Sequence, residues 1–209
     1  MINQRMLALG NEPSAIRELF AYGLARKAEI GDDKVFDFSL GNPSIPAPDS
    51  VRQAIAEALN EPACALHGYT PAQGTPAVRQ AVANTILRRH GFEVSPDRIY
   101  MTAGAAAGLA IAIAAVTDPG DEVIVVAPYF PEYKVFIESA GCTCIEVPAR
   151  ADDFQLDANA IHAATTPKTS AVIINSPNNP TGAVYGREVL KDLGDALRDK
   201  EEAYGTQIH

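Results

Sequence analysis

From Ile99 onward the sequence alternates short apolar runs with longer helical patterns, and this rhythm constrains the fold more than any other feature. The apolar runs are rich in valine and isoleucine and are predicted as strands at Ile99–Thr102, Val123–Ala127, Cys144–Val147 and Ala171–Ile174. Helices are predicted at Gly104–Val116, Pro131–Ala140, Asp157–Ala164 and from Arg187. Short apolar strands separated by helices are typical of parallel sheets. The sequence therefore predicts an α/β fold, with a mainly parallel sheet and helices on both faces.

The first part of the chain has a different rhythm. A helical pattern covers "PSAIRELFAYGLARKAEIG" and stops at Gly31, and the alternating "VFDFSLG" predicts a short strand. Asp49 or Ser50 is expected to cap a helix that runs through Leu59. Thr75 and Pro76 open another helix, which runs to about His90 and stops at Gly91. Residues 1–41 are therefore expected to belong to a separate, smaller domain.

Charge and composition exclude several classes of partner. The 209 residues carry a net charge of -9, with acids and bases interspersed, which disfavours nucleic acid and anionic membranes as partners. The N-terminus has no secretory signal pattern, and the longest apolar run is shorter than the roughly 20 residues that span a bilayer. Three cysteines suit no metal site and are expected to be reduced and half-buried. These features predict a cytoplasmic protein without a membrane segment.

In open parallel sheets, ligands bind beyond the carboxyl ends of the strands, so the residues that follow each predicted strand are the candidates for a binding site. The segment "TAGAAAG", Thr102–Gly108, passes directly from a predicted strand into a predicted helix and is built from small residues. A helix N-terminus with exposed N–H groups can bind a phosphate. The alternative is that small residues only let the helix pack closely on the sheet. The segment is neither a GxGxxG fingerprint nor a P-loop.

Two further segments follow strands. "APYFPEY", Ala127–Tyr133, brings three aromatic rings together, which could be core residues or a platform on which a flat ligand stacks. "NSPNNPTGAVY", Asn175–Tyr185, combines asparagines that support turns with two prolines that stiffen the backbone. A rigid turn can hold an amide where a ligand oxygen needs a donor. Together the three segments predict a site for a planar phosphorylated ligand.

In their order along the chain, these motifs resemble the first half of a class I/II aminotransferase, a pyridoxal-phosphate enzyme of fold type I. The resemblance runs from "FSLGNPSIPAP" through "YTPAQGTPAVRQAVA" and "YMTAGAAAGLAIAIAAVTDPGDEVIVVAPYFPEY" to "VIINSPNNPTGAVY". It implies that residues 1–41 contribute to the small domain and residues 42–209 form the N-terminal part of the large, cofactor-binding domain.

The resemblance also implies roles for individual residues. The backbone of Gly104, Ala105 and Ala106 would bind the phosphate of pyridoxal 5'-phosphate, Phe130 would stack on the pyridine ring, and Asn179 would donate to its phenolic oxygen. Tyr69 would reach the phosphate of a neighbouring subunit, which implies a homodimer. Gly41 would approach the substrate carboxylate through its backbone. Ala105–Ala107 depart from many relatives, which place Ser, Thr, Gln or Lys there, so this site is expected to depend more on the backbone.

Several catalytic and substrate-binding residues of the family have no counterpart in the sequence. The family uses a lysine that forms a Schiff base with the cofactor and an acid beside the pyridine nitrogen, both placed after the asparagine turn. No lysine stands in a matching context among Lys27, Lys34, Lys134, Lys168, Lys191 and Lys200. The arginines that usually bind the substrate carboxylate are also missing. We therefore expect an incomplete sheet, a catalytic site completed by further sequence, and no activity from the 209 residues alone.

The resemblance implies an aminotransferase that moves an amino group from an amino acid to a 2-oxo acid. Two alternatives stay open, namely a lyase or synthase of the same fold and a non-catalytic fragment that binds phosphate. A nucleotide-binding doubly wound domain is disfavoured, because its glycine fingerprint is absent. The sequence does not distinguish between amino donors.

Overall fold

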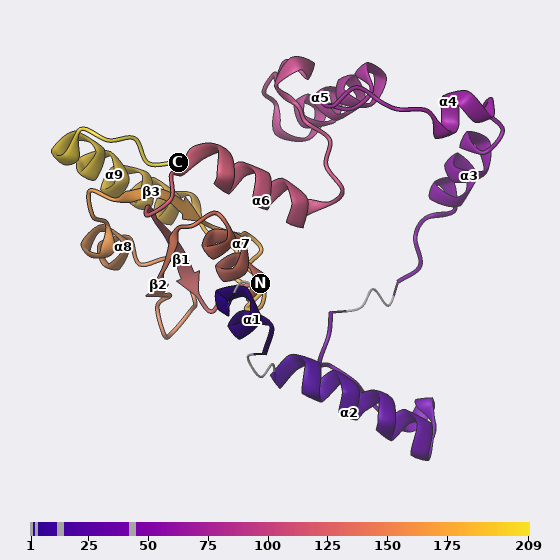
Figure 1. Ribbon diagram of the computed structural model, residues 1–209, viewed down its shortest axis with the longest axis horizontal. Helices are drawn as coiled ribbons and strands as arrows, with labels where there is room; N and C mark the ends of the chain where they lie inside the picture. Colours follow the sequence, from indigo (N-terminus) through magenta and orange to yellow (C-terminus); the bar gives the residue numbers. More distant parts are fainter. Residues whose placement is uncertain (1, 3, 12–14, 42–44) are drawn as a thin grey trace. The chain divides into compact units, whose positions relative to one another are not determined.

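The computed structural model describes residues 2, 4–11, 15–41 and 45–209 (Figure 1). The chain divides into two compact units, residues 1–100 and residues 101–209.

The unit of residues 101–209 is built on a three-stranded parallel sheet. Its strands are β1 (Glu122–Ala127), β2 (Thr143–Pro148) and β3 (Thr169–Ile173), in the order β2-β1-β3. Both β2 and β3 pair with β1 in parallel. His209 lies beside β3, where its N–H donates to the Ser170 carbonyl at 2.8 Å and its carbonyl accepts from the Val172 N–H at 2.9 Å. The predicted α/β class with a mainly parallel sheet is confirmed.

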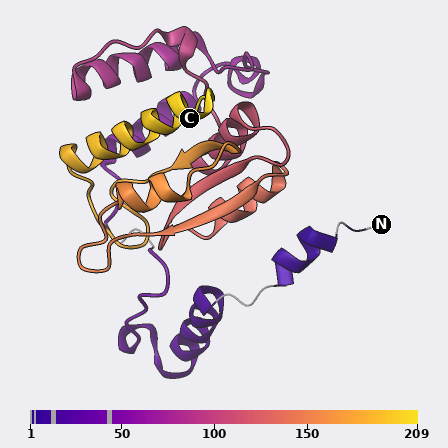
Figure 2. The same cartoon turned by 90° about the vertical axis from the view of Figure 1, so that its left-hand side faces the viewer.

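Strand β1 is buried on both faces. Val123 and Val125 pack with α6 (Ala105–Val116) and α7 (Glu132–Ser139), through Ile113 and Ile137. On the other face, Ile124 and Val126 pack with α8 (Ala158–Ala164) and α9 (Arg187–Tyr204), through Ile161 and Leu193. Figure 2 shows the yellow α9 and the orange α8 side by side. This double burial explains why β1 is apolar at consecutive positions rather than at alternate ones.

The prediction of strands at residues 99–102 and 35–41 is wrong. Residues 99–102 and 35–41 are irregular in the structure. Neither segment pairs with a strand among the residues that the structure describes, and their backbone hydrogen bonds are local ones, such as that from the Ile99 N–H to the Pro96 carbonyl. A strand without a neighbour would leave a row of N–H and C=O groups unpaired. Side chains of both segments are accordingly open to solvent, with Phe38 exposed to 91% and Tyr100 to 65%.

The unit of residues 1–100 is helical in its described parts. Its helices are α1 (Gln4–Asn11), α2 (Ala15–Ile30), α3 (Asp49–Ala58), α4 (Ala63–His67) and α5 (Pro76–His90), with short 3-10 turns at Asp32–Lys34 and Pro96–Arg98. The prediction missed α1 and α4, and Pro13 and Ser14 lie outside the described residues. Helix α5 ends at Gly91, whose φ of 75° is left-handed, as its glycine predicted. Asp49 does not cap α3, because it is already the first helical residue and the N-cap is Pro48.

Apolar side chains in the described part of residues 1–100 are mostly exposed. On α3, Val51, Ile55 and Leu59 at its end are exposed to 44%, 59% and 66%, respectively. Ala83 is the one hydrophobic side chain that is buried among those described in this unit. The core of the chain therefore lies in residues 101–209.

The double burial of β1 predicts a clear difference between two valine substitutions. Val125→Ala, at a fully buried position, should lower the free energy of unfolding by about 2 kcal/mol or more, because it removes buried methyl groups and leaves a cavity. Val184→Ala, at a position exposed to 64%, should change it by less than about 0.5 kcal/mol. Urea unfolding measures both, and equal losses would contradict the assignment of the core.

Candidate functional site

The first candidate segment lies at the N-terminus of α6. The loop Thr117–Asp121 joins the C-terminus of this helix to the amino end of β1, and within it the Asp118 N–H donates to Asp121 Oδ2 at 2.9 Å. Ile113 of α6 packs on Val123 and Val125 of the sheet. A helix that lies along the sheet and ends beside its amino edge must begin toward the carboxyl edge. The small-residue corner therefore belongs to the edge at which parallel sheets bind ligands.

The geometry of this corner refines the predicted phosphate contacts. Gly104 is the N-cap of α6 with a φ of 88°, a conformation that favours glycine. Its N–H donates to the Thr102 carbonyl at 2.8 Å, and its carbonyl accepts from Thr102 Oγ1 at 3.0 Å. Ala105 and Ala106 are exposed, and no acceptor for their N–H groups is found in the described part of the chain. The donors open to an anion thus include those of Ala105 and Ala106.

The second segment follows β1, and its Phe130 packs against a buried tyrosine of the same segment. The ring of Tyr133 is buried and meets Phe130 edge-on, with centroids 5.6 Å apart. Tyr133 also stacks on Tyr129 at 6.3 Å, and the Tyr129 hydroxyl donates to Glu146 Oε1 at 2.9 Å. Burial, followed by this hydrogen bond, raises the pKa of Tyr129. The core interpretation is confirmed for Tyr133, whereas Phe130 is only partly buried and its stacking on a flat ligand stays a prediction.

The third segment follows β3 and separates the roles of its asparagines. Asn178 is buried, and its Oδ1 accepts from the Thr181 N–H at 3.2 Å and from the Thr181 hydroxyl at 3.0 Å. Its Nδ2 donates to the Tyr185 hydroxyl at 3.2 Å. Asn179 is exposed, and its backbone N–H donates to Asn175 Oδ1 at 2.8 Å. No described residue forms a hydrogen bond with the Asn179 side chain, so this amide is available to a ligand.

Because β1 and β3 are parallel neighbours, the segments that follow them start from the same edge of the sheet. Phe130, Asn179 and the N-terminus of α6 are thus associated with one edge. Gly41 and Tyr69 belong to the unit of residues 1–100, where both are exposed.

Other features of the chain do not compete with this edge as a chemical centre. Lys191 pairs with Asp195 at 2.6 Å on α9, and Lys168 precedes β3 at the opposite edge. No disulfide joins the described cysteines, of which Cys64 is exposed, Cys142 buried and Cys144 intermediate. Burial raises the pKa of the Cys144 thiol to about 11. Among the described residues, no group of His, Cys, Asp and Glu could hold a metal ion, and no helix could cross a membrane.

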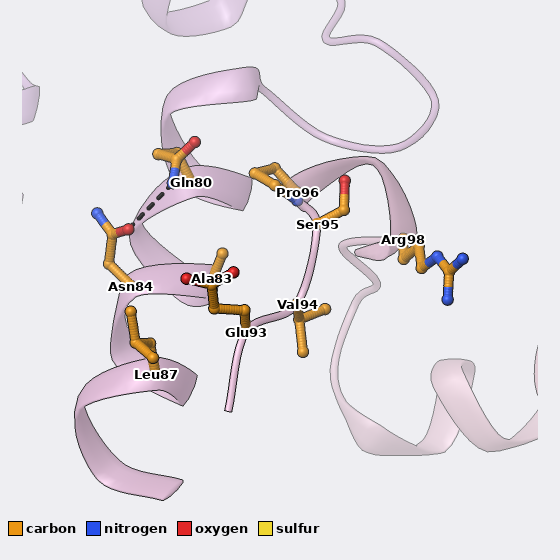
Figure 3. Close-up of a pocket in the computed structure, with 9 residues that line it drawn as sticks. All are labelled: Gln80, Ala83, Asn84, Leu87, Glu93, Val94, Ser95, Pro96 and Arg98. Atoms are coloured by element: carbon orange, nitrogen blue, oxygen red, sulfur yellow. Dashed lines mark hydrogen bonds between the residues drawn. The ribbon is translucent and has the colours of Figure 1, made fainter. Parts of the chain in front are cut away.

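Two grooves lie away from the predicted site residues. One, of about 590 Å³, runs between α5 and residues 93–98, and Figure 3 shows Gln80 bonded to Asn84 at 3.0 Å on its wall. The other, of about 620 Å³, runs between α8 and α9 and is lined by several aspartates, of which Asp199 contacts His162 at 2.6 Å. Neither groove is lined by Thr102–Gly108, Phe130 or Asn179.

Comparison with known proteins identifies the family. The profile described as "Aminotransferase class I and II" matches residues 33–203. The chain belongs to the class I and II aminotransferase family. It is 40% identical over 177 residues to an aspartate aminotransferase of Streptomyces avermitilis, a match that covers 84% of this chain and 43% of the relative.

Solved structures agree with this assignment. A crystal structure of an aminotransferase from Eubacterium rectale superposes with a TM-score of 0.93 at 48% identity, over 100% of this chain and 53% of that one. The aspartate aminotransferase of Thermus thermophilus with maleate superposes with a TM-score of 0.80 at 31% identity, over 100% and 52%. The chain thus has the fold of these fold type I enzymes and spans about half the length of the relatives it matches.

Members of this family depend on pyridoxal phosphate, and the residues at the carboxyl edge fit that group. The open N–H groups of Ala105 and Ala106 suit a phosphate, and Thr102–Gly108 carries no acidic side chain that would repel it. The partly exposed ring of Phe130 suits a flat heterocycle, and the unpaired amide of Asn179 suits a ring oxygen.

The sequence prediction missed the residues that support this edge. Asn178 and Tyr185 share a buried hydrogen bond, and Asn175 holds the Asn179 backbone. All of them lie within the quoted motif, but composition alone does not tell which of two adjacent asparagines is buried.

The different burial of the two asparagines predicts different effects on stability. Asn178→Ala should lower the free energy of unfolding by about 3 kcal/mol, because it leaves buried groups of Thr181 and Tyr185 without their partner. Asn179→Ala should lower it by less than about 0.5 kcal/mol, because the side chain is exposed. Urea unfolding of both variants measures the difference, and a larger loss for Asn179→Ala would refute the arrangement.

Proposed function

We propose that this chain is part of a pyridoxal-phosphate-dependent aminotransferase that transfers an amino group from an amino acid to a 2-oxo acid. The observation that supports this most is the association of Ala105, Ala106, Phe130 and Asn179 with one edge of a parallel sheet. Each brings the chemistry that a different part of the cofactor needs. Membership in the aminotransferase family supports the reaction class.

Each residue has a distinct role in this proposal. The N–H groups of Ala105 and Ala106 bind the phosphate, and Gly104 provides the left-handed turn that opens them to it. Phe130 stacks on the pyridine ring and keeps water from that face. The Asn179 amide donates to the phenolic oxygen. The bound cofactor supplies the electron sink for the reaction.

The proposal extends to residues 1–100. The Gly41 backbone approaches the substrate carboxylate, and Tyr69 reaches the phosphate in the neighbouring subunit of a homodimer. The full exposure of the Tyr69 side chain and the exposed apolar residues of α3 support a partner that covers them. Residues 1–41 contribute to the small domain, residues 42–209 to the large domain, and the enzyme is cytoplasmic.

The Schiff-base lysine comes from sequence beyond these 209 residues in this proposal. Support comes from relatives about twice as long and from the placement of Lys168, which precedes β3 at the opposite edge of the sheet, and of Lys191 and Lys200, which lie on α9. A fragment that binds phosphate without catalysis is the second candidate, favoured by the same placement of lysines. A lyase or synthase of this fold would share the carboxyl edge and differ in its products.

An intact-mass measurement separates the first two candidates. We expect the purified protein to be heavier than the 22.2 kDa of this sequence, and borohydride reduction to attach the cofactor to a lysine outside it. A panel of amino donors that starts with aspartate, the substrate named for the Streptomyces relative, then tests for 2-oxo acid products. A folded 22.2 kDa protein that gives no adduct would overturn the aminotransferase assignment.

The proposed role of Asn179 predicts a loss of cofactor affinity. Asn179→Ala should weaken pyridoxal phosphate binding by about tenfold, because it removes a hydrogen bond to a charged oxygen. Asn159→Ala is the matched control, since Asn159 is an exposed asparagine on α8. Equilibrium dialysis measures both affinities, and equal affinities for the two variants would remove Asn179 from the site.

A further inference from the structure

The exposed amide of Asn179 is supported by a buried hydrogen bond between its neighbour Asn178 and Tyr185. Asn178 Nδ2 donates to the Tyr185 hydroxyl at 3.2 Å, and the two residues are exposed to only 8% and 6%. Burial raises the pKa of Tyr185, so its hydroxyl stays neutral and can accept this bond. The bond joins two points of the turn that are seven residues apart.

Hydrogen bonds join the residues of the turn on both sides of Asn179. Its start is held by Asn175, whose Oδ1 accepts from the Asn179 N–H at 2.8 Å. Its end is held by Tyr185, whose N–H donates to the Ser176 hydroxyl at 3.0 Å. Between them, the Asn178 backbone bonds to Gly182 and Ala183 at 2.8 and 2.9 Å. These hydrogen bonds fix the backbone of the turn, and a fixed backbone restricts the orientations open to the Asn179 side chain.

Tyr185, which bonds to the neighbour of Asn179, also lies near Tyr133, which contacts Phe130. Tyr133, which contacts Phe130 edge-on at 5.6 Å, has its pKa raised by burial and then by the nearby Tyr185 phenol. Tyr133 belongs to the core on one face of the sheet and Tyr185 to the core on the other. Each face of the sheet thus supplies one buried tyrosine that contacts a residue of these segments, Phe130 in one case and Asn178 in the other.

We propose that Asn178 and Tyr185 are positioning residues, which hold the Asn179 amide in the direction that the phenolic oxygen of the cofactor requires. The inference rests on the proposed function, because it assigns Asn179 to that oxygen. Neither positioning residue itself contacts the cofactor. A purely structural role for the pair would change stability and leave the properties of the bound cofactor unaltered.

The test compares Tyr185→Phe with Thr165→Val in the intact protein that carries this sequence. Both variants remove one buried hydroxyl, and Thr165 bonds to Ile161 at the end of α8, outside the turn. We expect Tyr185→Phe to speed hydrogen exchange about tenfold at the N–H groups of the turn, because its central bond is lost. These are the N–H groups of Asn179, Thr181, Gly182 and Ala183.

The second readout is the pH midpoint of the absorbance change of bound pyridoxal phosphate. A misaligned Asn179 donates less well to the deprotonated phenolic oxygen, so the midpoint should rise by about half a pH unit in Tyr185→Phe. Thr165→Val should change neither the exchange rates nor the midpoint. Asn178→Ala should raise the midpoint at least as far as Tyr185→Phe, and Tyr185→Phe alone decides the test if that variant fails to fold.

The outcomes separate this inference from the proposed function. Wild-type protein that binds no pyridoxal phosphate would overturn the proposed function and the inference that rests on it. Wild-type protein that binds it, with an unchanged midpoint and unchanged exchange in Tyr185→Phe, would overturn the positioning role alone. Equal changes in Tyr185→Phe and Thr165→Val would also overturn it, because they would show a general loss of stability.

Discussion

The burial of β1 on both faces is the interaction on which the described structure depends. Val123 and Val125 bind α6 and α7 to one face, while Ile124 and Val126 bind α8 and α9 to the other. The same strand pairs with both of its neighbours through its backbone. Every helix of this unit thus packs, directly or through its neighbours, on one strand. This packing fixes the carboxyl edge of the sheet, from which the candidate segments start.

A rigid sheet edge is what a cofactor site requires, because the contacting groups come from segments far apart in the sequence. Phe130 follows β1 and Asn179 follows β3, and the parallel pairing of these strands brings both to one edge. The residues proposed to contact the cofactor are partly or fully exposed, while Tyr133, Asn178 and Tyr185 are buried beside them. In this proposal, binding groups and supporting groups occupy neighbouring positions.

The described part of residues 1–100 has a different physical character. Apolar side chains such as Leu19, Phe38 and Ile55 are exposed, and no described residue of this unit covers them. This chain covers about half of the family's solved structures. Large exposed apolar faces are typical of surfaces that another segment or another chain covers.

The sequence by itself determined the α/β class, all three strands of the sheet, and the residues of the family motifs. It could do so because apolar periodicity and glycine and proline signals act over a few residues, as at β1 and at Gly91. Only the tertiary structure decided that residues 99–102 and 35–41 are not strands, because pairing requires a distant partner. It also decided that Asn178 is buried and Asn179 exposed, because that choice depends on where Tyr185 and Thr181 lie in space.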